Sequence, residues 1–298
     1  MATSPQADAR MRDTTLASAH ERAQDPANGW RGEALDLDAY LRRIGYTGPL
    51  ELDAATLAGV HRAHTRSIAF ENVDLVLGRP ISLEVEDLQT KMVDSKRGGY
   101  CYEQNLLLAA ALERIGFSVR GHAARVRVGG GLRPSTHMLL TVDLGDEGRM
   151  IADVGFGGGG PLEPIPLHDG AEVRQGRWLF RLRHEGGVEW GLDNAAGTQW
   201  DDVYGFTDTP FHRSDYTVFS YYLSTHPRSP FRGRLFVQRS EDTVRHSLTG
   251  TTLTAQYPDA TTTGRDLDPR DLSAVLRDVF GIELDRDEAS ALVRTAQD

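Results

Sequence analysis

The spacing of apolar residues changes near Gly116, and this change limits the folds available to the chain. Before Gly116, apolar side chains recur every three or four residues, the spacing of amphipathic helices. After Gly116, they alternate with polar residues in runs rich in Val, Ile, Thr and aromatic side chains, the pattern of half-buried strands. The sequence therefore predicts an α+β protein: an N-terminal helical bundle followed by a mostly antiparallel sheet or β-barrel.

Capping residues mark several of the predicted helices. The stripe of Leu37, Tyr40, Leu41 and Ile44 follows Asp36 or Asp38, which are good N-caps, and ends at Gly45. The other helices predicted in the first third lie at about 53–65, after Ser82, and from about 101 to 115, before Gly116.

Glycine clusters separate the predicted strands as hairpin loops do. They stand at 129–131 and 186–187. The strands predicted in the middle third are 119–128, 137–144, 149–154, 177–183 and 188–192. The last third is expected to mix strands at 234–239 and 247–254 with a helix that follows Asp268 and Pro269. Residues 1–33 lack apolar periodicity and are predicted to form a flexible extension.

Charge and composition exclude several classes of protein. The 298 residues include 33 Lys and Arg against 43 Asp and Glu, a net charge of −10, which disfavours a nucleic-acid or anionic membrane surface. The longest apolar run, Leu106–Leu112, is far shorter than a membrane-spanning helix requires. The first thirty residues lack the apolar core of a secretory signal. We expect a cytoplasmic protein with a small-molecule substrate.

The chain has a single cysteine, Cys101, so it cannot form an intramolecular disulfide or a zinc site of several cysteines. His61 and His64 lie one turn apart on a predicted helix, but no third ligand accompanies them at a familiar spacing. The sequence predicts no metal site.

The position of Cys101 suggests a nucleophile. It follows Gly98 and Gly99 at the first turn of a predicted helix, where unpaired N–H groups and the helix dipole favour a thiolate. The alternative is that this residue is a small buried hydrophobe, the usual role of a lone cysteine.

A cysteine nucleophile needs a base, and the base needs an acceptor to orient it. His137 stands at the start of one predicted strand, and Asp153 stands near the end of the next, before the glycine-rich stretch 155–160. Adjacent antiparallel strands would bring both side chains to the helix of Cys101. The stretch 157–160 lacks the trailing Gly-Lys-Ser/Thr of a nucleotide-phosphate loop.

Residues 97–105 read Arg-Gly-Gly-Tyr-Cys-Tyr-Glu-Gln-Asn. This segment resembles the Arg-Gly-Gly-x-Cys-x-Glu-x-Asn signature of the arylamine N-acetyltransferases at every fixed position. Other stretches that resemble the family are Phe70-Glu71-Asn72, Leu77–Ile81, Thr136-His137, Ala152–Gly157 and Ser224–Pro227. The resemblance covers roughly residues 34–298.

The resemblance implies a fold of three regions around a core like that of cysteine proteases. These are a helical bundle at 34–117 that supplies the nucleophile, a β-barrel at 118–218 that supplies His and Asp, and a C-terminal α/β lid at 219–298. It implies a Cys101–His137–Asp153 triad that moves an acetyl group from acetyl-coenzyme A to an aromatic amine or hydrazine in two steps.

The resemblance also implies roles for pocket residues. Phe70, Val126 and Phe156 match the acceptor pocket, with core packing as the alternative for Phe70 and Phe156. Four further residues lie on segments near coenzyme A: Thr136, Gly157, Thr225 and Phe231. The four consecutive glycines at 157–160 remove the side chains usual there, so a wider acceptor site is possible.

Other functions remain open at this point. An amide synthase of the same family would release a polyketide from its thioester with the same triad. A cysteine hydrolase or transglutaminase would use the same three residues with water or lysine as the acceptor. A non-catalytic binding module is disfavoured by the intact set of Cys101, His137 and Asp153.

Overall fold

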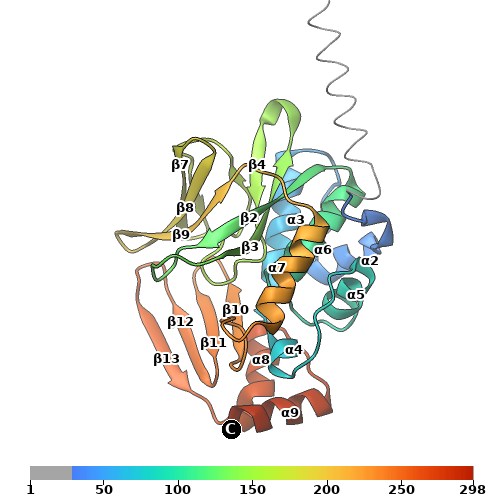
Figure 1. Cartoon of the computed structure of the whole chain (residues 1–298), viewed down its shortest axis with the longest axis vertical. Helices are drawn as coiled ribbons and strands as arrows, with labels where there is room; N and C mark the ends of the chain where they lie inside the picture. Colours follow the sequence, from blue (N-terminus) through green and yellow to red (C-terminus); the bar gives the residue numbers. More distant parts are fainter. Residues whose placement is uncertain (1–28, 298) are drawn as a thin grey trace, which may run out of the picture.

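A computed structural model describes residues 29–297 of the chain (Figure 1). Most of the predicted extension, 1–33, lies outside the described residues, but its last residues belong to the fold. Trp30 is buried, its indole Nε1 donates to the Val119 carbonyl at 3.2 Å, and its backbone N–H donates to Glu113 at 2.8 Å. The prediction of a flexible segment up to residue 33 is therefore wrong at its end, because a large aromatic side chain anchors that segment.

The helical region is built around one central helix. Asp36 caps α2 (Leu37–Ile44) by accepting the backbone N–H of Ala39, and Asp53 caps α3 (Ala54–Ser67) by accepting that of Thr56. The helix α6 (Cys101–Ile115) is buried along most of its length and ends at Gly116, whose φ is 117°. The other helical elements are η1 (Gly32–Ala34), α2 (Leu37–Ile44), α3 (Ala54–Ser67), α4 (Val73–Val76), α5 (Val85–Leu88) and the π-helical η2 (Gln89–Asp94).

The middle of the chain forms an antiparallel eight-stranded sheet that curls into a nearly closed barrel, which confirms the predicted fold class. The spatial order of its strands is β5-β4-β3-β2-β9-β8-β7-β6. They are β2 (Ser118–Val126), β3 (Ser135–Asp143), β4 (Arg149–Ala152), β5 (Ile165–Pro166), β6 (Glu172–Gln175), β7 (Trp178–Gly186), β8 (Glu189–Ala196) and β9 (Gln199–Thr207). The side chains of Trp178, Phe180 and Tyr204 fill its interior.

A second sheet, of order β1-β10-β11-β12-β13, lies below the barrel in the view of Figure 1. Its strands are β1 (Phe70–Glu71), β10 (Phe236–Ser240), β11 (Arg245–Thr249), β12 (Thr252–Gln256) and β13 (Thr262–Asp266). The predicted strand 247–254 is wrong: Gly250, at a φ of 60°, makes a hairpin turn that divides it into β11 and β12. Because β1 belongs to the helical region, this sheet connects the N-terminal third of the chain to the C-terminal third.

The remaining helices follow the barrel in the sequence. The helix α7 (Arg213–Thr225) packs against β3, and its N-cap is His212, whose backbone N–H donates to Asp215. The predicted boundary between residues 218 and 219 therefore falls inside a helix. The helices α8 (Leu272–Phe280), preceded by η4 (Pro269–Asp271), and α9 (Arg286–Gln297) lie at the base of Figure 1. Between residues 29 and 297, the structure contains no helix of the length and apolarity needed to cross a membrane.

We expect Trp30→Ala to lower the free energy of unfolding by about 3–5 kcal/mol, because it removes a buried ring that packs 6.4 Å from the ring of Tyr216. Urea denaturation measures the change. Leu132→Ala is the control: Leu132 is 91% exposed, so its loss should change stability by less than about 0.5 kcal/mol. Equal stability of the two variants would contradict the assignment of Trp30 to the core.

Candidate active site

Cys101 is the first residue of α6 and is buried. The turn before it is capped by Glu103, whose Oε2 accepts the Tyr100 N–H at 3.0 Å. Gly98 is required there because a Cβ at that position would lie 2.2 Å from the Ala69 carbonyl oxygen. The Cys101 Sγ lies 3.9 Å from the carbonyl oxygen of Thr136, at the start of β3. The sulfur therefore faces the strand that carries His137.

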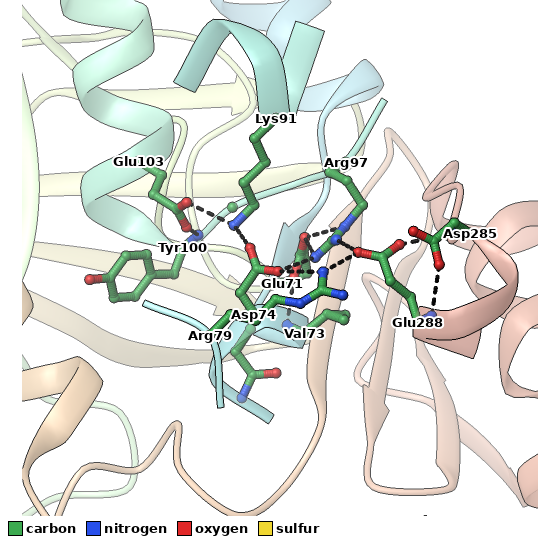
Figure 2. A network of polar contacts seen from close by, with 12 residues as sticks. Glu71, Val73, Asp74, Arg79, Lys91, Arg97, Tyr100, Glu103, Asp285 and Glu288 are labelled. Atoms are coloured by element: carbon green, nitrogen blue, oxygen red, sulfur yellow. Dashed lines mark hydrogen bonds and ion pairs between the residues drawn. The ribbon is translucent and has the colours of Figure 1, made fainter. Parts of the chain in front are cut away.

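Figure 2 shows a buried network of charges at the base of this turn. Arg97 donates from Nε and Nη2 to Glu71 Oε1 at 3.0 and 2.8 Å, and from Nη1 to Glu288 of α9 at 2.8 Å. Lys91 contacts Glu103 Oε1 at 2.7 Å and Asp74 Oδ2 at 2.6 Å. These contacts fix the Gly-Gly turn between β1, η2 and the C-terminal helix, so the first residue of α6 has a defined position.

His137 and Asp153 form a buried ion pair. The Asp153 Oδ2 lies 2.7 Å from His137 Nε2, which leaves Nδ1 as the ring nitrogen available to a thiol. Burial opposes the charge on the ring, but Asp153 and then Cys101 more than offset this effect and raise the pKa of His137 to about 10. The pKa of Asp153 is lowered despite burial, chiefly by His137. The imidazole is therefore protonated at neutral pH.

Asn105, one turn along α6 from Cys101, fixes Asp153 relative to the nucleophile. Its Nδ2 donates to Asp153 Oδ1 at 3.0 Å and to the Met138 carbonyl at 2.7 Å, while its Oδ1 accepts the Val154 N–H at 3.1 Å. Asn105 thus bridges β3 and the end of β4. The geometry places a thiol, an imidazole and a carboxylate next to one another, the kinds of groups that covalent acyl transfer requires.

Cys101 and His137 open into a mostly apolar cavity of about 730 Å³. Aromatic rings line the part formed by β1, β10, the loop before β10 and the loop after β4: Phe70, Phe156, Phe231 and Phe236. A cavity of this kind suits a flat, apolar ligand, because aromatic walls bury its surface while excluding water.

The structure brings most of the predicted site residues to this cavity. Those that line it, besides Cys101 and His137, are Phe70, Val126, Thr136, Phe156 and Phe231. Asp153 lies behind His137 and is buried. Gly157 is not among the lining residues, although Gly158 and Gly159 are, and Thr225 is exposed on α7 with its hydroxyl bonded to the Tyr221 carbonyl.

Sequence reasoning missed two residues of the cavity wall, Asn194 and Arg245, and one behind it, Tyr204. The ring of Tyr204 lies 5.3 Å from that of His137 and 5.4 Å from that of Phe156. Arg245 stacks 3.6 Å over Trp178 and donates to Asn194 Oδ1 at 2.9 Å. Tyr204 and Asn194 lie on strands β9 and β8, whose inward positions only the closure of the barrel reveals. No motif marked any of them.

Within residues 29–297, no cluster of three or more His, Cys, Asp or Glu side chains has the arrangement of a metal site. The two histidines of α3 bond to protein groups instead: His61 to Leu162 and Asp153, and His64 to Tyr40.

We expect Asp153→Asn to lower the pKa of His137 from about 10 toward or below its ordinary value of about 6.5, because burial then acts without the opposing carboxylate. NMR titration of the imidazole signals measures this pKa. Retention of a pKa near 10 in the variant would contradict the pairing.

The same pair makes stability depend on pH. The raised pKa of His137 stabilises the fold fully below about pH 6.5, and this contribution disappears as the pH rises through about 10. The lowered pKa of Asp153 has the opposite dependence, with stabilisation lost toward acid. The difference in unfolding free energy between wild type and Asp153→Asn should therefore shrink at alkaline and at strongly acidic pH.

The chain is similar to known proteins over most of its length. A family model described as N-acetyltransferase matches residues 53–289. The arylamine N-acetyltransferase of Mycolicibacterium smegmatis is 40% identical over 258 residues, which cover 84% of this chain and 93% of that protein.

Solved structures agree with the sequence relatives. The arylamine N-acetyltransferase of Nocardia farcinica superposes with a TM-score of 0.85 at 45% identity, covering 91% of this chain and 97% of that one. The Mycobacterium marinum enzyme in complex with CoA superposes with a TM-score of 0.81 at 33% identity, covering 87% of this chain and 98% of that one. Both matches extend over helices, barrel and C-terminal sheet.

Proposed function

The chain belongs to the arylamine N-acetyltransferase family, and we propose that it moves an acetyl group from acetyl-coenzyme A to an aromatic amine or hydrazine through an acetyl-cysteine at Cys101. The observation that carries the proposal is the position of Cys101 at the start of α6, against a His137 that is paired with buried Asp153 at 2.7 Å. These three residues are proposed as the catalytic triad.

In the first step, the Cys101 thiolate attacks the carbonyl carbon of the acetyl thioester. Backbone N–H groups at the start of α6 stabilise the oxyanion, because the first N–H groups of a helix have no partner within it. The bond between the acetyl carbon and the coenzyme sulfur then breaks. The proton of the His137 imidazolium passes to that sulfur, and coenzyme A leaves as a thiol.

In the second step, the neutral amine attacks the acetyl-cysteine while His137 takes a proton from its nitrogen. A carbon–nitrogen bond forms, the bond from carbon to the Cys101 sulfur breaks, and the thiolate–imidazolium pair returns. Aromatic amines suit this step because their low basicity keeps them neutral near pH 7, whereas alkylamines are mostly charged. Phe70, Val126 and Phe156, which line the cavity, are proposed to hold the acceptor.

Acetyl-coenzyme A is proposed as the acyl donor, supported by the CoA complex of the Mycobacterium marinum relative. Thr136, Gly157, Thr225 and Phe231 are proposed to lie near the coenzyme. Two exposed cations, Arg133 and Arg228, line the same cavity as Cys101. They would offset the charge of the coenzyme phosphates in a chain whose net charge is −10.

Intact mass spectrometry tests the covalent step. Wild type mixed with acetyl-coenzyme A alone should gain one acetyl group, and an arylamine added afterwards should remove it. Cys101→Ala should gain none and should lose transfer, since no other thiol exists in the chain. Turnover by a folded Cys101→Ala would end the proposal.

The absence of side chains at Gly158 and Gly159 is proposed to widen the acceptor site. Gly159→Leu should lower kcat/KM for bulky arylamines by about 10-fold or more, because the new side chain enters the cavity next to Phe156. The rate of acetylation by acetyl-coenzyme A, measured by release of the free thiol before the amine is added, should change little. Equal losses for small and bulky amines would contradict this role.

A further inference from the structure

His61 on α3 joins the two ends of the glycine-rich loop that follows β4. Its Nε2 lies 3.0 Å from the Asp153 backbone nitrogen, and its Nδ1 lies 3.1 Å from the Leu162 carbonyl oxygen. The segment between these two contacts carries Phe156 and the glycines of the cavity wall. One imidazole therefore closes the base of the loop next to the acid of the triad.

The two contacts determine the tautomer of His61. A backbone N–H can only donate, so Nε2 accepts the hydrogen bond from Asp153 and carries no proton. A carbonyl oxygen can only accept, so Nδ1 carries the proton and donates it to Leu162. Burial, the largest influence, lowers the pKa of His61 to about 4, so the ring is neutral at pH 7. A neutral ring with this tautomer satisfies both backbone groups.

The ring takes the place of a hydrogen bond between strands. Ile151 of β4 pairs with Ile165 of β5, and continuing this register would bring Asp153 beside Glu163 and Val154 beside Leu162. The strands separate at that point, and the imidazole stands between Asp153 and Leu162. Asn105 does the same on the other edge of β4, between Val154 and Met138. The end of β4 is held from both sides.

This separation determines where the Asp153 carboxylate lies. Its Oδ2 reaches His137 at 2.7 Å while its backbone N–H is held by His61. Asn105 fixes the carboxylate from the side of α6, and His61 fixes the main chain from the side of α3. Without His61, a buried N–H would lack a partner, and the main chain at Asp153 would move to find one.

We propose that His61 is a positioning residue for the transfer reaction, which holds the Asp153 main chain so that the carboxylate can orient and charge His137. This inference rests on the proposed function, since it assumes the triad. His61 itself touches neither the thiol nor the cavity. Its effect on the reaction passes through the distance between Asp153 and His137.

Two substitutions distinguish the hydrogen-bond acceptor Nε2 of His61 from the rest of its side chain. In His61→Asn, the short amide can replace Nδ1 and donate to Leu162, but it cannot reach the Asp153 N–H. In His61→Gln, the longer amide places an acceptor oxygen near the position of Nε2. We expect His61→Asn to lower kcat by about 10- to 100-fold with KM values within about 3-fold of wild type, and His61→Gln to recover most of the loss.

The reactivity of Cys101 gives a readout that simple loss of packing would not change. Because Cys101 is the only cysteine, iodoacetamide labels a single thiol, and the rate can be followed against pH. A displaced carboxylate stabilises the His137 imidazolium less, so the midpoint of alkylation in His61→Asn should rise by about 1 pH unit or more. His61→Gln should keep the wild-type midpoint.

His122→Asn is the matched control. His122 is a buried histidine on β2 that contacts the Thr209 carbonyl at 3.2 Å and Thr141 Oγ1 at 2.9 Å, away from α6 and from the loop after β4. This variant should lose stability in urea comparably to His61→Asn but keep the wild-type midpoint and kcat. A wild-type midpoint and kcat in folded His61→Asn, or equal shifts in both variants, would overturn the proposal.

A measurement on the wild type keeps the inference testable even where His61→Asn does not fold. In protein labelled with ¹⁵N-histidine, NMR at pH 7 should show His61 with a protonated Nδ1 and a bare Nε2. A proton on Nε2 would overturn the proposal. The proposed function fails separately: in that case His137→Ala would leave the wild-type alkylation midpoint unchanged, whatever the tautomer of His61.

Discussion

The arrangement of the helices and strands around the site depends on how the buried carboxylate of Asp153 is paired. An ionised carboxylate away from water is stable only when paired and hydrogen-bonded. Asp153 has partners from three directions: His137 on β3, Asn105 on α6 and the backbone N–H of Gly155 in its own loop. The helical region, which supplies Asn105, and the barrel, which supplies His137, therefore meet at one buried charge. A shift of either region would remove one of its partners.

A second set of buried charges lies on the other side of Cys101. Arg97 and Lys91 neutralise acids from β1, α4, α6 and α9, and so tie the turn before Cys101 to the C-terminal helix. Breaking such a pair by removing one partner leaves an uncompensated charge, which costs several kcal/mol. The first turn of α6 is thus fixed by ion pairs at its base and by Asn105 one turn later. This rigidity fits a residue proposed to attack a thioester at a defined angle.

The sequence predicts well where local chemistry decides the structure. Asp36, Gly45 and Gly116 mark helix ends through capping, which depends on neighbouring residues alone. The segment 97–105 was informative because close packing forbids side chains at its glycines. Position 250 was misjudged because an isolated glycine between polar and β-branched residues fits a strand as well as a turn.

What the sequence could not predict depends on contacts between distant segments. The strand β9 was missed because Asp201 and Asp202 interrupt its apolar pattern, and only the barrel shows that its second half points inward. His61 illustrates the same limit. Its spacing from His64 on α3 raised only the question of a metal ligand. Its actual partners, Asp153 and Leu162, could not be predicted because they are 92 and 101 residues away.

The burial and apolar lining of the cavity favour acetyl transfer to an amine over hydrolysis by water. An acetyl-cysteine is a thioester, which water can hydrolyse. It transfers its acetyl group to an amine only if water has less access to the thioester than the amine has. Cys101 and His137 are both almost fully buried, and aromatic rings form the nearest walls. A bound arylamine would cover these rings and exclude water, so that the acceptor itself would complete the dry site in which His137 is proposed to remove its proton. The two open glycines at 158 and 159 limit this effect, because a small amine would leave part of the cavity to water. Under the proposed mechanism, we therefore expect acceptors that fill the space left by the glycines to be the better substrates.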